Sequence, residues 1–320
     1  MLSGFVIGYA YDDRWNRMTV GTFLQTPYHS PASYGDYGKH CGAAFFYFQE
    51  SPCFPPIENT SVGTMLLVML LGCTLLPLPL KFDIRGWTEM HPLNGPAWSL
   101  YYEYIGNILY ALFVRKFNKV ALSVLVFVAG CFTVYRCLTA PAGDIVGGWA
   151  LNWEQQYVGM VRLMYPFFGG LLLSRLGWLI RLEKRAFWWC SLLIVVVLSI
   201  PRIGGEDGYW MNGLYEAFCI ICVFPVIVSM GAGGKVTGKR STAVCKFLGD
   251  ISYPIYITHY PLVYTYTAWV CNNNATMMEG IPYMILTFVG AVVLAYACLK
   301  LYDEPVRRWL TDRFLKGKKK

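Results

Sequence analysis

The residues of this chain that could do chemistry are a few ionisable side chains inside apolar stretches. They are Glu103, Arg162, Glu216 and His259. An ionisable group at the centre of a bilayer costs at least about 2.5–3.5 kcal/mol, so it usually has a task in a substrate path, a proton relay or a ligand contact. These four residues are therefore the candidate site residues, if the stretches around them cross a membrane.

Glu103 has polar neighbours at helical spacing. It follows Ser99 by four residues, so a helix would place both side chains on one face, close to the aromatic ring of Trp98. We expect a polar cluster that faces a cavity. The alternative, an interfacial Glu103 paired with an Arg, stays open at this point.

His259 is the only histidine deep within an apolar stretch, and it follows Tyr256 by three residues. Pro254 and Pro261 bracket it, which predicts a break in the helix and freed carbonyl groups that need partners. We favour a functional His259 that shares a face with Tyr256. A histidine that is hydrogen-bonded between two helices is the alternative.

Arg162 and Glu216 allow two interpretations. Either side chain could contact an anionic ligand, and together they could form a structural ion pair. The ion pair is the slightly stronger expectation, because Arg162 stands near the start of its apolar run and can extend toward the interface.

The composition excludes several classes of protein. Among 320 residues, 56% are hydrophobic and only 14% are charged, with a net charge of +8. A soluble domain has about 25% charged residues, and disordered chains are poor in aromatics, which here reach 17%. The basic residues are dispersed between apolar runs, which argues against a nucleic-acid partner. An all-α, polytopic membrane helix bundle remains.

A helix needs about 20 mostly apolar residues to cross the hydrocarbon core. About eight runs come close to this length, and they predict a single domain over residues 1–320 with about 8–10 transmembrane helices. The runs are Val62–Leu80, Leu93–Val114, Val120–Tyr135, Tyr157–Leu173, Ala186–Pro201, Tyr209–Ala232, Phe247–Val270 and Ile281–Tyr302.

The loops between these runs alternate in charge. Residues 115–119, 175–185 and 235–246 are basic, as is the tail 303–320, whereas 136–156, 202–208 and 271–280 are neutral or acidic. This positive-inside pattern predicts a cytoplasmic C-terminus and a basic cytoplasmic tail. The side of the membrane stays open before Val62, because the scheme would place the acidic segment 50–61 in the cytoplasm.

The eleven cysteines are scattered, and their spacing indicates no disulfide framework. Cys219 and Cys222 form a CxxC pair inside an apolar run without nearby metal-ligating residues. We interpret this pair as membrane packing and expect no metal site.

Four segments resemble, in order, the motifs of the membrane-bound acyltransferase-3 family. The segment 95–100 followed by Glu103 resembles the family's WSLxxE signature, and the leading Leu2-Ser3-Gly4-Phe5 resembles its LSGF segment. Residues 248–256 followed by His259 resemble the LGxISYxLYLxH segment, and residues 302–307 resemble the C-terminal YEKPxR segment. The resemblance covers nearly the whole chain.

The resemblance implies an O-acyltransferase of a bacterial inner membrane. Such proteins move an acyl group, often acetyl from acetyl-CoA, to a hydroxyl of an extracytoplasmic carbohydrate such as a surface polysaccharide. Membrane lipid, acyl-CoA donor and glycan acceptor are then the partners, with acyl-CoA as co-substrate and no bound cofactor. Glu103 and His259 would be catalytic. Substrate would be bound by Trp98, Ser99, Tyr256, Arg162 and Glu216.

The chain departs from the family in two places. The family's first helix carries an essential histidine, which is absent here, so the helix at residues 1–10 is expected to be incomplete. Residues 23–42 fit neither the basic loop nor the apolar helix of the family. One allowed set of codons for this segment, read one nucleotide later, encodes both features in order, which predicts that 23–42 is out of frame and that activity is low or absent.

Two other functions remain as alternatives. Buried charges and broken helices would also suit a transporter of polysaccharides or small molecules, although no inverted internal repeat is visible. A non-catalytic membrane partner is the third possibility, and it gains weight if the histidine of the first helix is missing in the cell.

Overall fold

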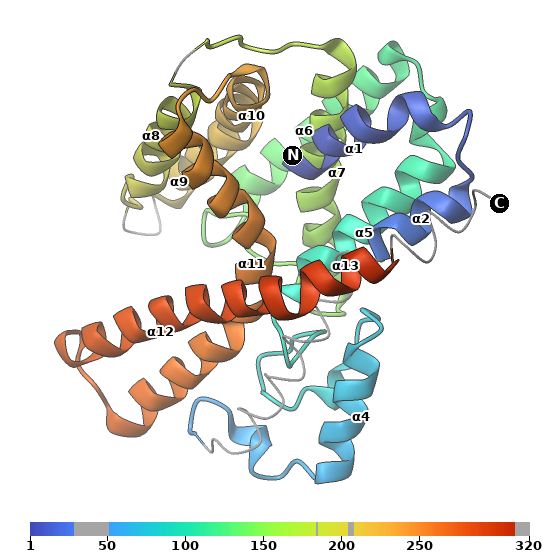
Figure 1. Cartoon of the computed structure of the whole chain (residues 1–320). Coiled ribbons are helices and arrows are strands. Elements are labelled where there is room, and N and C mark those ends of the chain that lie inside the picture. Colours follow the sequence, from blue (N-terminus) through green and yellow to red (C-terminus); the bar gives the residue numbers. More distant parts are fainter. Residues whose placement is uncertain (29–50, 184, 204–207, 311–320) are drawn as a thin grey trace. The chain divides into compact units, whose positions relative to one another are not determined.

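The chain is all-helical over the residues that the structure describes. A computed structural model describes residues 1–28, 51–183, 185–203 and 208–310, and it contains no strand in these ranges. The α-helices are α1 Leu2–Tyr11, α2 Val20–Tyr28, α4 Val62–Gly72, α5 Ala97–Leu112, α6 Lys119–Thr139, α7 Trp153–Leu176, α8 Ala186–Ser199, α9 Tyr209–Phe218, α10 Phe224–Gly233, α11 Lys239–Asn273, α12 Met277–Cys298 and α13 Glu304–Leu310 (Figure 1). The predicted all-α class is confirmed.

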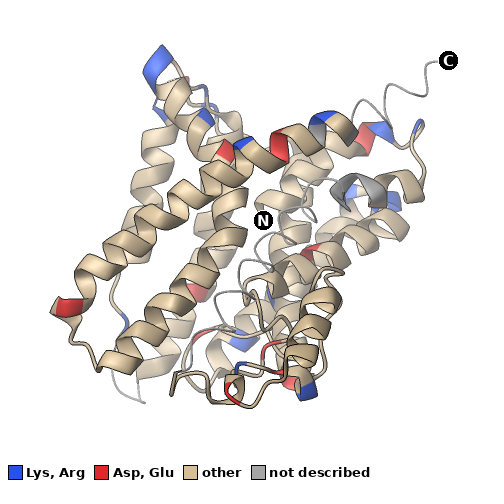
Figure 2. Cartoon of the chain, turned by 60° about the horizontal axis from the view of Figure 1, so that its bottom comes forward, with Lys and Arg blue, Asp and Glu red and all other residues tan. Residues whose placement is uncertain are grey.

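Four helical stretches are long and apolar enough to cross a membrane. Among the described residues they are Lys119–Thr139, Trp153–Leu176, Tyr209–Gly233 and Met277–Val306. Figure 2 shows long helical stretches without charged residues. In the stretch Met277–Val306 no charged residue lies between Glu279 and Lys300, a distance of about 31 Å along a helix. This matches the thickness of the hydrocarbon core, about 30 Å, so the chain is a multi-pass membrane protein.

The chain divides into two compact units, each built from separate segments. The first unit contains Met1–Val20, Tyr102–Gly148 and Trp153–Cys245, and the second contains Gly21–Tyr101, Trp149–Asn152 and Lys246–Lys320. Because the segments of the two units alternate along the sequence, neither unit is a consecutive domain. The out-of-frame prediction for 23–42 falls largely on residues outside the described ranges, as does the tail beyond 310.

In the first unit, α1 packs closely against α7 through glycines (Figure 1). A Cβ atom on Gly4 would lie 1.7 Å from the carbonyl oxygen of Phe167, and one on Gly170 would lie 1.9 Å from that of Met1. Small residues let the backbones of membrane helices approach in this way. The glycine of the LSGF segment therefore has a packing role.

The second unit has a hydrophobic core between α4, the loop that follows it and α11. Its buried members are Phe54, Ile57, Met65, Val68, Leu78, Ile84, Leu93, Tyr264 and Ala268. The loop turns back on itself where the N–H of Leu78 donates to the carbonyl of Met90 at 2.9 Å. Segment 51–97 thus forms a clasp that packs against the second half of α11, and we call it the clasp segment.

The predicted span Val62–Leu80 is wrong. Helix α4 has 11 residues and ends at Gly72, so it covers about 16 Å, half of the hydrocarbon core. Leu75 then takes a left-handed conformation with φ of 56°, and Pro77 and Pro79 cannot continue a helix. Of the apolar residues beyond the helix, Leu78 belongs to the core of the clasp segment, whereas Leu76 and Leu80 are exposed.

The predicted break of the helix around His259 is also wrong. Helix α11 runs without interruption for 35 residues, with Pro254 and Pro261 inside it. It lies alongside α12 in antiparallel orientation (Figure 1), with the rings of Trp269 and Tyr283 stacked at 3.7 Å. Packing on two sides keeps α11 continuous, and the carbonyl that Pro261 frees has found a partner, as described below.

Candidate functional site

The signature segment at the start of α5 is hydrogen-bonded to α11 within the second unit. The hydroxyl groups of Ser99 and Tyr256 lie 2.5 Å apart, and each lies 3.1 Å from the carbonyl oxygen of Pro96. One hydroxyl hydrogen can bridge the pair while the other is donated to that carbonyl. The structure thus brings together Ser99 and Tyr256, which the sequence assigned to one site from positions 157 residues apart. Trp98 lies half-buried beside them.

The loop before α5 makes two further bonds to α11. The Asn94 side chain donates from Nδ2 to the carbonyl of Ile257 at 3.0 Å, and the N–H of Gly95 donates to the Tyr264 hydroxyl at 3.0 Å. A side chain on Gly95 would collide with that hydroxyl, because its Cβ would lie 2.6 Å away. Sequence reasoning missed Asn94, although its position beside a glycine and a proline was visible.

The ring of His259 is held in one tautomer. Its Nδ1 lies 2.8 Å from the carbonyl oxygen of Ile255, and a carbonyl can only accept, so Nδ1 carries the hydrogen. In the neutral ring Nε2 is then the acceptor. The ring of Tyr256 lies 6.2 Å from it between centroids, which confirms that these two residues share a face. His259 is half-buried.

Glu103 belongs to the first unit and His259 to the second, so their convergence stays a prediction. Glu103 stands one turn after Ser99 in the unbroken helix α5, as the spacing predicted. Its side chain is half-buried, and none of the ion pairs among the described residues involves it. The alternative of a Glu103 paired with an Arg thus finds no support there.

Arg162 and Glu216 both hold one loop of the first unit. Arg162 donates from Nη1 to the carbonyl of Gly147 at 2.5 Å, and Glu216 accepts from the N–H of Ile145 at 2.8 Å. The two charges are also within electrostatic range of each other. Anchoring of residues 145–147 is therefore the role that the contacts show, and substrate binding by these two residues stays a prediction.

A buried ion pair in the clasp segment was missed by sequence reasoning. Arg85 is fully buried and forms a salt bridge with Glu89 four residues later. Its guanidinium carbon lies 3.4 Å from the ring centre of Tyr264 and 4.8 Å from that of Trp87, which are cation–π contacts. Burial raises the pKa of Glu89 and lowers that of Arg85, so each charge depends on its partner. The spacing of four residues between Arg85 and Glu89 was the one sequence feature that could have predicted this ion pair.

A second polar network closes one end of the first unit. Arg175 binds Asp12 through two hydrogen bonds, of 2.7 and 3.0 Å, and the Tyr110 hydroxyl donates to Asp12 at 2.7 Å. Arg175 also donates to the carbonyl of Phe117 at 2.9 Å. This network ties the end of α1 to the loop before α6 and has a positioning role within the unit.

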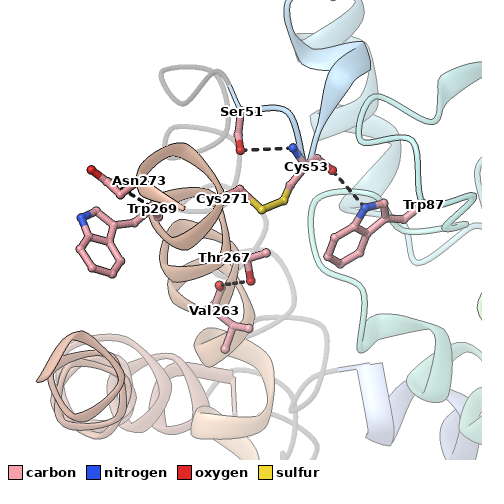
Figure 3. The surroundings of a disulfide bond; sticks show 8 residues. All are labelled: Ser51, Cys53, Trp87, Val263, Thr267, Trp269, Cys271 and Asn273. Atoms are coloured by element: carbon pink, nitrogen blue, oxygen red, sulfur yellow. Dashed lines mark hydrogen bonds between the residues drawn. A yellow bond between two sulfur atoms is a disulfide. The ribbon is translucent and has the colours of Figure 1, made fainter. Parts of the chain in front are cut away.

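One disulfide joins the clasp segment to the end of α11. Cys53 and Cys271 are bonded, with Cα atoms 6.4 Å apart, and the indole N–H of Trp87 donates to the carbonyl of Cys53 at 3.1 Å (Figure 3). The prediction of no disulfide framework did not foresee this bond. Cys219 and Cys222 are free thiols in a π-helical turn, and no group of three metal-ligating residues occurs among the residues searched.

Two of the motif segments line one cavity of the second unit. The cavity of about 550 Å³ is bounded by Gly249, Asp250 and Tyr253 from α11, and by Asp303 and Glu304 near the start of α13. These residues come from the segments 248–259 and 302–307. Their meeting at one cavity shows that the two motifs are spatial neighbours.

Comparison with known proteins gives one match. A family model described as an acyltransferase domain, acyltransferase family 3, matches residues 1–299. No curated protein and no solved structure matches the chain. The match covers almost all of the chain, including the first three motif segments, and it ends just before the fourth, 302–307. The chain therefore belongs to the acyltransferase-3 family of membrane acyltransferases, enzymes that transfer acyl groups other than aminoacyl groups.

Proposed function

We propose that this enzyme moves an acyl group, acetyl in the simplest case, from acyl-CoA to a hydroxyl of an extracytoplasmic carbohydrate. The observation that supports this is the hydrogen-bonded meeting of Ser99 with Tyr256, one turn from His259, whose Nε2 is an acceptor. Ester formation needs a base that takes the proton of the sugar hydroxyl, for which the imidazole is suited, and hydrogen-bond donors near the reacting carbonyl, for which the two hydroxyl groups are suited.

The reaction would proceed by attack of the sugar oxygen on the thioester carbonyl carbon. The sugar proton passes to a base, for which His259 Nε2 and the Glu103 carboxylate are the candidates, and a C–O bond forms as the carbonyl becomes an oxyanion. Hydroxyl donors such as Tyr256 and Ser99 would stabilise that oxyanion. Collapse of the intermediate breaks the C–S bond and releases the CoA thiolate, which takes up the proton.

Acyl transfer can be measured with membranes that contain the chain, radiolabelled acetyl-CoA and surface glycan. We expect base-labile label in the glycan that is lost on Glu103→Gln and on His259→Ala, and reduced at least about tenfold on Tyr256→Phe. Glu58→Gln and Tyr283→Phe are matched controls, since they make the same chemical changes at residues of the second unit outside the candidate site. Absence of any label with the wild-type chain, or its persistence in His259→Ala, would refute the proposal.

We further propose that the clasp segment and the α11–α12 turn lie outside the cytoplasm, and that the C-terminus lies inside. Disulfides persist in oxidising compartments and are rare in the cytosol, and Cys271 is two residues from the end of α11. The positive-inside pattern indicates the same orientation independently. The disulfide also supports an outside position for the acidic segment 51–61, whose side the loop charges left open.

This orientation can be tested with an epitope tag fused after Lys320. We expect protease to remove the tag in inverted membrane vesicles and to leave it intact in whole cells. The opposite pattern would overturn the orientation without affecting the acyltransferase proposal.

A further inference from the structure

Helix α11 lacks one backbone hydrogen bond that it cannot make by itself. Pro261 has no N–H, so the carbonyl four residues earlier, that of Ile257, lacks its helical partner. Such a carbonyl needs a replacement when it is buried, because water cannot reach it. Ile257 is 1% exposed, so its carbonyl needs a donor from the protein.

Asn94 supplies the missing donor. Its Nδ2 lies 3.0 Å from the Ile257 carbonyl oxygen, and its side chain is also 1% exposed. The two residues are 163 positions apart in the chain. The side-chain amide of Asn94 therefore replaces the backbone N–H donor that the helix lacks, in a site closed to water.

The bond sits where it can orient the candidate site. Ile257 is next to Tyr256 and two residues before His259, while Asn94 is five residues before Ser99. The carbonyl to which His259 binds, that of Ile255, belongs to the same helical turn. Without a donor, the Ile257 carbonyl would be stable only if α11 bent at Pro261 to reach another partner, and such a bend would shift this turn.

We propose that Asn94 is a positioning residue of the acyltransferase site. By replacing the N–H that Pro261 lacks, it fixes the course of α11 at this turn, which sets the hydroxyl of Tyr256 against Ser99 and the imidazole of His259 one turn further along. This proposal rests on the proposed function for its kinetic consequence, whereas its structural part stands on the bond itself.

The test is a double-mutant cycle between Asn94→Ala and Pro261→Ala. Pro261→Ala restores a helical N–H to the Ile257 carbonyl, so it should make Asn94 dispensable. Two readouts are used: acyl transfer, separated into kcat and KM for acetyl-CoA, and amide hydrogen exchange of the peptide 253–265 in the detergent-solubilised full chain. Asn94→Leu is a second variant, which keeps nearly the same volume but removes the donor.

We expect Asn94→Ala to lower kcat about 10–100-fold at nearly constant KM, since a misplacement of about 1 Å can have an effect of that size, and to speed exchange in 253–265. Asn94→Leu should act similarly. In the double variant most of both effects should disappear. Asn212→Ala is the matched control: it removes a donor to the Ile203 carbonyl, also at 3.0 Å, and should change neither exchange in 253–265 nor its response to Pro261→Ala.

Additive effects in the double variant, or unchanged exchange in Asn94→Ala, would overturn the proposal. If the wild-type chain transfers no acyl group, the proposed function fails, and the exchange cycle still decides whether Asn94 holds α11. If Asn94→Ala does not fold, recovery of folding by Pro261→Ala supports the proposal, and failure of the double variant to fold overturns it.

Discussion

Removing the Cys53–Cys271 disulfide should lower the stability of the second unit. The bond closes a loop with a sequence separation of 218 residues, for which chain entropy alone gives about 5 kcal/mol in a fully flexible unfolded chain. In a membrane protein, the intervening spans stay helical and inserted after unfolding, which shortens the freely moving chain. We therefore expect a loss nearer about 2–4 kcal/mol, or roughly 5–10 °C in Tm.

The assay compares thermal unfolding of the purified chain in detergent with and without a reductant. Cys53→Ser, Cys271→Ser and the double variant should all fall to the same lower Tm, since each removes the same bond. Reduction of the wild-type chain should bring it to that Tm, and reductant should not affect the double variant. Cys245→Ser is the control, because it removes a half-buried thiol that takes no part in a disulfide.

The same bond reports on the compartment. In intact cells, a membrane-impermeant reductant followed by an impermeant maleimide should label Cys53 and Cys271, and maleimide alone should label neither. A wild-type Tm that does not respond to reductant would refute the stabilisation. Labelling that requires permeabilised cells would refute the assignment of the clasp segment to the outside.

Two further perturbations test packing within each unit. Gly4→Ala should destabilise the first unit by about 1–3 kcal/mol, because the new Cβ would lie 1.7 Å from the carbonyl oxygen of Phe167. Gly63→Ala is the control and should be neutral or stabilising in the same thermal assay, because its new Cβ would have one neighbouring atom within 4 Å, at 3.9 Å. Arg85→Met should cost about 3–5 kcal/mol by leaving Glu89 buried without its partner, and adding Glu89→Gln should recover part of this loss, which chemical unfolding in detergent can measure.

The fold could be predicted from the sequence where apolar composition and helix length agree. The run Val120–Tyr135 became α6, Lys119–Thr139. Its start moved by only one residue because Asn118 caps the helix by accepting from the N–H of Ala121. The run Val62–Leu80 failed because composition alone does not distinguish a membrane span from the core of a folded loop. The prolines after residue 76 carried that information.

The candidate site was predictable where spacing along one helix decides the outcome. The interval of three between Tyr256 and His259 correctly predicted a shared face. Contacts between distant segments were out of reach, because nothing local distinguishes Cys53 or Cys271 from the other cysteines. Asn94 is the same kind of case, since its role depends on a proline in another helix.

The attachments of the clasp segment to α11 follow the period of the helix. Ile257, Tyr264 and Cys271 are seven residues apart, so they lie close to one line along α11, and they meet Asn94, the Arg85 cluster and Cys53 respectively. A rotation of α11 by one residue, about 100°, would break all three attachments together, so the register of the helix is fixed.

The same period leaves His259 outside that line. It stands two residues after Ile257, about 200° around the helix, so the face of α11 that the clasp segment holds is not the face that presents the imidazole. His259→Ala should therefore abolish acyl transfer while leaving the Tm and the response to reductant unchanged. A variant that loses activity and the disulfide-dependent stability together would show that the two faces are not independent, and that the imidazole has a structural role in this unit.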